Sequence, residues 1–371
     1  MIAAFYREAW GDEATAESVL AARHEAAAQN VAAPGEAPPT ALVLEGTRVI
    51  GYCSSIPQRL WDGATEHPAY WVKGLMVLPE YRNGPIGFLV VQQLAAQLPR
   101  STALAVARAA RRLFSALGYT DLGAVANFVR PLRPASLASR LDFGQLGLEG
   151  LPRWVTAAVR VTQGTGLARL AGGVVGIALD AASALQRRGA NRFIAGPTHE
   201  ALPQGELDDL WRRARRGLAA SSVRDGVHFR GRFGDTLTER ANNPYECVTV
   251  REAARLMGVA ALRRPRATSD PRLRGIRVAS ISDIVFPPEL ADVGLALLGA
   301  VEQAARAAGA DAILCTTSHR ALTPLLRRRA YLRVPGNVHF FLRDTTGVER
   351  WPLDLASWWL ARGDGKSDEV F

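Results

Sequence analysis

The segment from Trp71 to Leu98 constrains the fold most, because a strand, a turn and a helix follow one another within it. An apolar run, Trp71–Leu78, has the composition of a strand, and a helical pattern begins after Gly87. The first turn of a helix leaves backbone N–H groups unpaired, and the helix dipole places positive charge there. The segment therefore predicts an α/β layer with an anion-binding turn, in which Arg82 is the cation.

This turn differs from the common nucleotide-binding loops. No Gly-Lys-Ser/Thr follows it, as a P-loop requires, and the spacing G-x-G-x-x-G of a dinucleotide fold is absent. Gly84 and Gly87 would let a ligand approach the backbone closely. The alternative interpretation is an ordinary strand-to-helix turn punctuated by glycine and proline.

The elements around the turn resemble those of the GNAT superfamily of N-acyltransferases. Val77 to Gly87 reads Val-Leu-Pro-Glu-Tyr-Arg-Asn-Gly-Pro-Ile-Gly, which is similar to the acyl-CoA loop of that family. The flanking segments agree in order and spacing over residues 1–132. They are a hairpin at Thr40–Cys53, a strand at Thr102–Ala107, a helix at Arg108–Leu117, and Gly118-Tyr119 in place of the usual Gly-Phe.

The resemblance implies that acetyl-CoA or another acyl-CoA is the co-substrate. The implied cofactor-binding residues lie at the end of the strand, in the turn and at the start of the helix: Leu75, Met76, Val77, Arg82, Asn83, Gly84, Ile86, Gly87 and Phe88. In this family a backbone N–H of the strand, here near Met76, stabilises the oxyanion. Pro85 replaces the first of two family glycines and has no N–H. Losing one hydrogen bond, worth roughly 0.5–1.5 kcal/mol, would weaken CoA binding without abolishing it.

The catalytic side chains expected from the resemblance are poorly represented. The position of the family's proton-donating tyrosine is Phe114, and no carboxylate lies on Trp71–Leu78. The remaining candidates for a general base are His24 on an early helix and Glu66 before the core strand, each beside a second candidate, Glu25 or His67. Solvated surface side chains are the alternative, and acyl transfer can also proceed by positioning alone.

The second half of the chain repeats the pattern of the first. A hairpin, a strand, a helix, and a further strand and helix are expected at Tyr245–Arg263, Ile276–Phe286, Glu289–Gly309, Ala312–Thr316 and Leu322–Arg329. The glycine pair is absent there, and Glu289 and Asp292 would repel a pyrophosphate from the first turn of the helix. The repeat predicts two tandem GNAT-like domains of mixed α/β class, the second without a CoA site.

The domain organisation expected along the chain has four parts. They are an N-terminal acyl-CoA-binding domain at 1–132, a helical linker at 133–192, a degenerate C-terminal domain at 193–345 and a tail at 346–371. Arg230 and Tyr245, near Arg232 and Asp235, are candidates for binding the substrate. The tail is rich in tryptophan and acidic residues. One interpretation is a terminal strap whose tryptophans cover apolar surface while Asp364, Asp368 and Glu369 are solvated.

Composition adds limits on partners and location. The chain of 371 residues carries a formal net charge of +10, which is almost wholly arginine because Lys73 and Lys366 are the only lysines. An anionic partner and a merely basic surface are both compatible with this charge. The three cysteines lie far apart and form neither a disulfide framework nor a metal site. No signal peptide is recognisable, and the longest apolar run, Leu170–Leu179, is shorter than a membrane span of about 20 residues, so we expect a cytoplasmic protein.

The expected activity is transfer of an acyl group, most simply acetyl, from CoA to a primary amine of an amino sugar or small metabolite. The tail is similar to those of tandem GNAT-like proteins in bacterial polysaccharide gene clusters. One alternative is an aminoacyltransferase of cell-wall type, for which tRNA would be the nucleic-acid partner. The other is a non-catalytic GNAT-like binding protein, which Pro85 and Phe114 favour. The sequence leaves the acceptor and the oligomeric state open.

Overall fold

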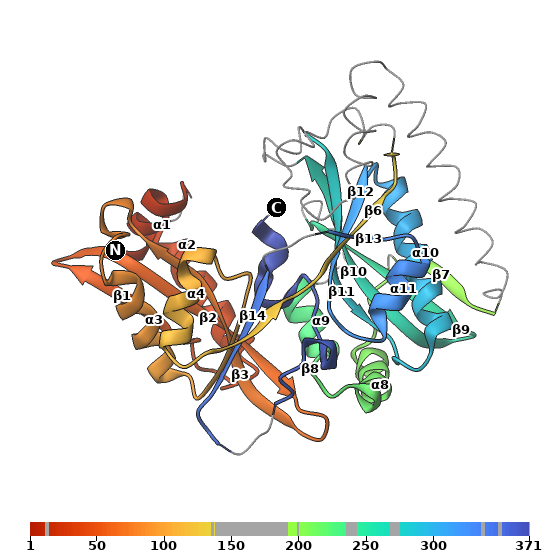
Figure 1. Cartoon of the computed structure of the whole chain (residues 1–371), viewed down its shortest axis with the longest axis horizontal. Coiled ribbons are helices and arrows are strands. Elements are labelled where there is room, and N and C mark those ends of the chain that lie inside the picture. The colour runs from red at the N-terminus through yellow and green to blue at the C-terminus, as the bar shows by residue number, and fades with distance from the viewer. Residues whose placement is uncertain are drawn as a thin grey trace. The chain divides into compact units, whose positions relative to one another are not determined.

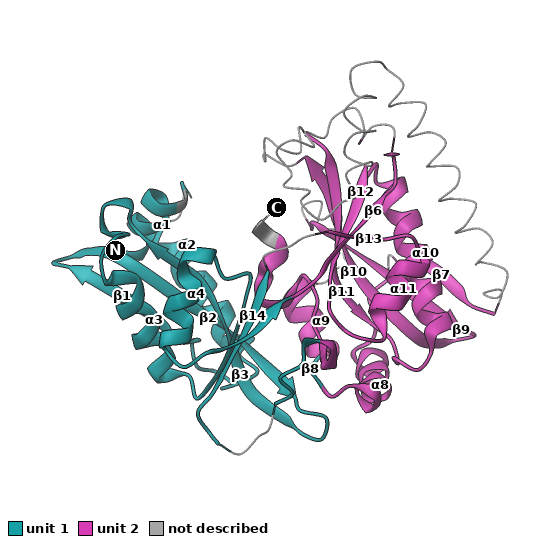
Figure 2. Cartoon of the chain, in the orientation of Figure 1, with its two compact units in different colours: residues 1–124, 220–223, 337–355 teal, residues 125–219, 224–336, 356–371 magenta. Residues whose placement is uncertain are grey.

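The computed structural model describes residues 1–11, 15–134, 137, 192–198, 200–234, 243–267, 275–334, 338–347 and 351–370 (Figure 1). The chain forms two compact units, which Figure 2 colours separately. Unit 1 comprises Met1–Ala124, Ala220–Val223 and Asn337–Leu355, and unit 2 comprises Val125–Ala219, Arg224–Gly336 and Ala356–Phe371. Each unit contains a mixed sheet with helices, so the predicted α/β class with two tandem units is confirmed. Most of the predicted helical linker, 133–192, lies outside the described residues.

Unit 1 is built on one sheet in the order β8-β2-β3-β4-β14-β5, with β1 also paired to β2. The strands are β1 (Thr40–Glu45), β2 (Arg48–Trp61), β3 (Glu66–Val77), β4 (Arg100–Leu104), β5 (Thr120–Ala124), β8 (Ala220–Ser222) and β14 (His339–Asp344). Strands β2 and β3 are antiparallel, whereas β3 and β4 are parallel. A short turn of 3₁₀ helix, η1 (Pro79–Tyr81), and helix α3 (Ile86–Gln97) make the connection that a parallel pair needs.

Helices cover the sheet of unit 1 through two apolar clusters. The first lies under α3 and α4 (Arg108–Ala116), because the apolar residues of α3 recur at helical spacing and form a buried stripe. Its buried members include Cys53, Val90, Leu94, Phe114 and Phe341. The second cluster joins Phe5 of α1 (Ile2–Trp10) to the β2 residues Val49, Ile50 and Tyr52. Helix α2 (Ala16–Ala28) has no buried residue.

Unit 2 is built on a second sheet in the order β13-β6-β12-β11-β10-β9-β7. The strands are β6 (Asn127–Pro131), β7 (Ile194–Thr198), β9 (Tyr245–Glu252), β10 (Arg255–Ala267), β11 (Arg277–Val285), β12 (Ala312–Thr316) and β13 (Leu332–Val334). The helices described in this unit are α8 (Gln204–Ala214), α9 (Gly226–Phe233), α10 (Ala291–Ala307) and α11 (Leu322–Arg328). Strands β9 to β13 follow the order of β1 to β5, as the sequence repeat predicts.

The two units exchange a strand. Strand β14, from the second half of the sequence, lies between β4 and β5 in unit 1, where Phe340 faces Leu104 and Gly123. Strand β6, from the first half, lies between β12 and β13 in unit 2, where Val129 faces Leu314 and Leu332. The ranges 1–132 and 193–345 expected from the sequence follow the chain continuously, whereas the compact units do not. The first range contains β6 of the unit 2 sheet, and the second contains β8 and β14 of the unit 1 sheet.

The C-terminal segment is ordered around β15 (Trp358–Trp359), between the short 3₁₀ helices η5 (Leu355–Ser357) and η6 (Asp364–Val370). Both tryptophans are buried, as a strap requires. The expectation that Asp364 and Asp368 are solvated is wrong, because these residues are 3% and 2% exposed. An arginine meets each carboxylate, although burial still raises the pKa of Asp364 against the opposing effect of Arg224.

The cysteines, possible metal ligands and helix lengths can be compared across the described residues. All three cysteines are free and buried, and burial raises the pKa of each thiol to about 12. Within the described residues, no group of three or more His, Cys, Asp or Glu side chains is placed to hold a metal ion. The described helices are all too short or too polar to cross a bilayer.

Candidate functional site

The predicted strand, turn and helix form as expected around residues 71–98 of unit 1. Leu78, which follows β3, donates its N–H to the carbonyl of Ile50 at 3.1 Å. The turn then closes on its own backbone, since Tyr81 donates to Leu78 at 2.9 Å and Gly84 donates to Tyr81 at 3.2 Å. These bonds deliver the chain to the first residue of α3, Ile86, with residues 82–85 exposed to solvent.

The N-terminus of α3 has the properties of an anion site. Pro85 is the N-cap residue and supplies no capping side chain. The N–H groups of the first helical residues, Ile86, Gly87 and Phe88, have no acceptor within a helix. Because proline stands at the N-cap, it removes its own N–H but none of these three. The donor lost at Pro85 is therefore one among several that a phosphate could use.

Arg82 is held at the end of β3. Its Nε donates to the carbonyl of Val77 at 3.0 Å, and its Nη2 lies 3.9 Å from the sulfur of Met76. The side chain is exposed, so the guanidinium is anchored on one edge and open to solvent on another. A guanidinium in this position can bind a phosphate through charge-assisted hydrogen bonds.

The acidic residue of the turn is compensated by a cation. Glu80 pairs with Arg48 at 2.8 Å, and Arg48 also contacts Glu8. The neighbouring hydroxyl of Tyr81 donates to Glu45 at 2.5 Å. These contacts tie the turn to β1, β2 and α1, and they reduce the repulsion that Glu80 would exert on a phosphate.

Glycines of the turn are not required by packing. A Cβ at Gly84 or Gly87 would meet its nearest neighbour at 3.5 or 3.6 Å, which is ordinary van der Waals contact. At the corresponding place in unit 2, a Cβ at Gly294 would lie 2.5 Å from Leu325 and 2.7 Å from the ring of Phe286. Gly294 is thus needed for packing, whereas Gly84 and Gly87 leave room for a ligand.

Strands β3 and β4 separate next to the turn. In the described register β3 pairs with β4 only at Tyr70 and Trp71, while its pairing with β2 continues to Val77. A bulge interrupts the β2–β3 register between Tyr52 and Ser54, and Gly74 there has a φ of 68°. The left-handed conformation explains the glycine. The bulge redirects the strand, and the edge beyond Trp71 offers backbone groups to a ligand.

The position of the expected catalytic tyrosine is filled by the buried ring of Phe114. This ring packs against Tyr119 and Phe341 with centroids 5.0 and 5.7 Å apart. The hydroxyl of Tyr119 is bonded to that of Ser101 at 2.8 Å, and burial raises the pKa of this phenol. Neither ring presents an accessible hydroxyl to the strand opening.

A tyrosine pair that the sequence analysis missed lies beside the bulge. The hydroxyls of Tyr6 on α1 and Tyr52 on β2 are 2.7 Å apart. The ring of Tyr52 is 3.5 Å from the position a Cβ would take on Gly74. Alternation along β2 could have indicated that Tyr52 faces α1, but no local pattern joins residues 46 positions apart.

The two residues predicted as catalytic are not brought together. His24 is exposed on α2. Glu66 pairs with Arg59 at 2.7 Å at the start of β3, which is roughly 36 Å along the strand from the turn at 3.3 Å per residue. Neighbouring His67 pairs with Asp62 at 2.8 Å. Their catalytic role stays a prediction.

The predicted substrate residues also differ in environment. Arg230 is exposed near the end of α9, whereas Tyr245 is buried and donates to Asp368 at 2.9 Å. Asp235 lies outside the described residues. Of the two acidic residues before α10, Asp292 lies in the first turn of the helix, as predicted, and Glu289 lies in the turn that precedes it.

Comparisons with known proteins agree with this geometry. The model of the acetyltransferase (GNAT) family matches residues 2–119. No curated protein matches the sequence.

Solved structures share the fold at low sequence identity. A GCN5-related N-acetyltransferase from Anabaena variabilis has 13% identity and a TM-score of 0.53 over 92% of this chain and 68% of its own. A protein from Enterococcus faecalis described as a probable N-acyltransferase has 10% identity and a TM-score of 0.53 over 91% of this chain and 68% of its own. The N-myristoyltransferase of Saccharomyces cerevisiae, with bound myristoyl-CoA, has 12% identity and a TM-score of 0.51 over 81% of this chain and 68% of its own. The family match thus covers the N-terminal segment, residues 2–119, which resembles an acetyltransferase domain of the GNAT family.

Proposed function

We propose that unit 1 binds an acyl-CoA and transfers its acyl group, most simply acetyl, to a primary amine of an amino sugar or small metabolite in the bacterial cytoplasm. The observation that carries the proposal is the turn between β3 and α3, where Arg82 is anchored on Val77 and the first N–H groups of the helix are uncapped. Arg82 and these N–H groups would bind the pyrophosphate. The yeast N-myristoyltransferase of similar fold was solved with myristoyl-CoA, which supports an acyl-CoA donor.

In the proposed reaction the amine attacks the thioester carbonyl and forms the C–N bond of a tetrahedral intermediate, whose C–S bond then breaks as the carbonyl re-forms and the nitrogen loses its second proton. A backbone N–H at the free edge of β3, near Met76, would stabilise the oxyanion. The ammonium must lose a proton before attack, and the CoA thiolate gains one when it leaves. The hydroxyls of Tyr6 and Tyr52 beside the bulge are candidates for this proton transfer.

The test is calorimetric titration with acetyl-CoA. We expect one site per chain, and we expect Arg82→Glu to lower the affinity more than tenfold, about 1.4 kcal/mol, because repulsion replaces a charged phosphate contact. Arg23→Glu on the exposed face of α2 makes the same change in net charge and serves as the control. Equal losses in both variants would remove the turn from the cofactor site.

A non-catalytic acyl-CoA-binding protein is a second candidate, which the buried Phe114 favours. Release of free thiol from acetyl-CoA in the presence of an amino-sugar panel separates the two functions. The enzyme releases thiol at a rate that depends on the amine and not on added RNase. Binding without any release would support the second candidate, and activity restricted to charged tRNA would exclude both.

A further inference from the structure

Unit 2 contains a strand opening like that of unit 1. Strand β11 pairs in parallel with β12 only from Val278 to Ile281, although its pairing with β10 continues to Val285. The β10–β11 register shifts beside Ser282, as the β2–β3 register does beside Gly74. Beyond Ile281, β11 therefore offers a free backbone edge at the place where the repeat puts the opening of unit 1.

The chain's own C-terminal segment occupies this edge. Gly363 donates its N–H to the carbonyl of Ser282 at 2.6 Å, and the indole of Trp359 donates to the carbonyl of Ile284 at 2.9 Å. Carbonyls two residues apart on a strand face the same way, so both bonds lie on one edge of β11. A Cβ on Gly363 would lie 2.6 Å from the Ser282 oxygen, so only glycine fits.

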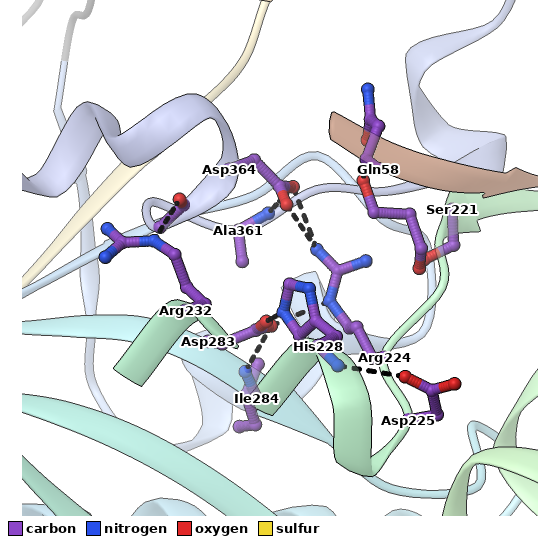
Figure 3. A network of polar contacts seen from close by, with 12 residues as sticks. Gln58, Ser221, Arg224, Asp225, His228, Arg232, Asp283, Ile284, Ala361 and Asp364 are labelled. Carbon is purple, nitrogen blue, oxygen red and sulfur yellow. Dashed lines mark hydrogen bonds and ion pairs between the residues drawn. The ribbon is translucent and has the colours of Figure 1, made fainter. Parts of the chain in front are cut away.

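One carboxylate of the segment, Asp364, is bound by a buried arginine (Figure 3). Arg224, which is fully buried, donates from Nε to Asp283 at 2.7 Å and from Nη2 to Asp364 at 2.8 Å. Asp364 also accepts from the N–H of Ala361 at 2.9 Å. Asp283 accepts in turn from His228 at 2.8 Å.

The second carboxylate of the segment, Asp368, is bound by a different set of residues. It contacts Arg232, and it accepts from the hydroxyl of Tyr245 at 2.9 Å. Arg263 bonds its backbone carbonyl, and Arg232 donates from Nε to the carbonyl of Gly363 at 3.1 Å. The segment is thus bound through its backbone, two carboxylates and an indole.

Opposite charges meet at two points of the segment. The receiving surface carries Arg224, Arg232 and Arg263 beside Asp283, and the segment brings Asp364 and Asp368 together with two cations of its own, Arg362 and Lys366. Burial tends to raise the pKa of Asp283, but Arg224 and His228 outweigh it and lower that pKa to about 2. Without Asp364 and Asp368, Arg224 and Arg232 would lack part of their compensating charge, which is costly for the buried Arg224.

We propose that unit 2 is a peptide-binding unit, whose opening between β11 and β12 recognises a segment bearing a tryptophan and two aspartates. The residue pattern recognised is Trp359, Gly363, Asp364 and Asp368, and the resident ligand is the segment Trp358–Asp368. Its contacts with unit 2 are non-covalent, and we expect a peptide of the same pattern to replace it once the connection to the chain is cut. The opening used for acyl-CoA in unit 1 serves a peptide in unit 2.

The test cleaves the backbone that joins the C-terminal segment to the rest of the protein, and both parts of the chain stay in the sample. A protease site is inserted between Leu353, which is 73% exposed, and Asp354, and the chain is cleaved after folding. We expect the cleaved segment to remain with the body in gel filtration, detected by mass spectrometry. A large molar excess of a labelled synthetic peptide of residues 354–371 should then exchange into the body.

Variants define the recognition. The double variant Asp364→Asn with Asp368→Asn should weaken retention of the cleaved segment more than tenfold. Asp354→Asn makes the same kind of change away from the arginine-bound aspartates, and it should leave retention unchanged. Gly363→Ala is a second variant, for use if the double variant fails to fold. It keeps every charge, and it should release the segment because the new methyl group would clash with the carbonyl of Ser282. Loss of the wild-type segment after cleavage, equal retention of all variants, or no exchange with excess peptide would overturn the proposal. Calorimetry with acetyl-CoA is independent of these readouts, so the proposed function can fail separately.

Discussion

The buried residue Arg224 is expected to contribute strongly to the stability of the protein. Its guanidinium bridges Asp283 and Asp364 with none of its side chain exposed. In Arg224→Met both carboxylates would lose their main partner, and we expect the free energy of unfolding to fall by about 3–5 kcal/mol. Arg212→Met, which breaks an exposed pair with Asp209 on α8, should cost at most about 1 kcal/mol. Urea unfolding followed by tryptophan fluorescence measures both, and similar losses would contradict the role of Arg224.

Some functional residues could be recognised from the sequence, and others only from the structure. Arg82, Gly84 and Gly87 were recognisable because their types and spacing suit an anion at a helix start, and the structure forms the predicted strand, turn and helix around them. The contrast between Gly87 and Gly294 was not readable, since both are glycines and only their surroundings differ. The pair of Tyr6 and Tyr52 was missed for the same reason, because tertiary packing decides which hydroxyls meet.

At the scale of elements, Gly51 sets the approach of α3 to the sheet. A Cβ at this position of β2 would lie 2.7 Å from Cγ2 of Ile86, the first residue of α3. That methyl group is attached to Cβ and cannot swing away easily. We expect Gly51→Ala to displace the start of α3, to destabilise unit 1 by about 1–3 kcal/mol and to weaken acetyl-CoA binding.

The matched control is Gly205→Ala in α8, where nothing lies within 4 Å of the new methyl group. It should leave acetyl-CoA binding unchanged and stabilise the helix by up to about 1 kcal/mol. Thermal unfolding and calorimetry report both effects. Unchanged CoA affinity in Gly51→Ala would separate the position of α3 from the proposed cofactor site.

Long, strongly patterned elements were predicted better than short ones. The hairpin at Thr40–Cys53 forms, although β2 continues beyond it to Trp61 through residues that are all buried or half-buried. Strands β6 and β14 carry too few residues to signal a partner. Their neighbours, β12 and β4, lie far away in the sequence, and strand propensity states only that a segment is extended. The exchange of β6 and β14 between the units therefore cannot be recognised from either strand's own sequence.

At the scale of the whole molecule, the exchange makes each half of the chain depend on the other. A fragment of residues 1–192 lacks β14, the strand between β4 and β5, and a fragment of 193–371 lacks β6. We expect each fragment alone to be aggregation-prone and unable to bind acetyl-CoA, because two open edges replace a central strand. Co-expression should restore a complex with the wild-type circular dichroism spectrum and one CoA site. A well-folded, CoA-binding fragment 1–192 would refute this dependence.

The position of β14 has a consequence for biosynthesis. Ser101 pairs with Arg343, so the sheet of the N-terminal domain closes over a separation of 242 residues, 343 minus 101. Such long-range pairing is slow, because loop-closure entropy is lost before the contact forms. Domains usually fold in order as they leave the ribosome, yet here the sheet of the first domain cannot close until His339–Asp344 has been synthesised. A premature stop codon before His339 would therefore leave the sheet of unit 1 without β14, although the codon lies more than 200 residues downstream of β4.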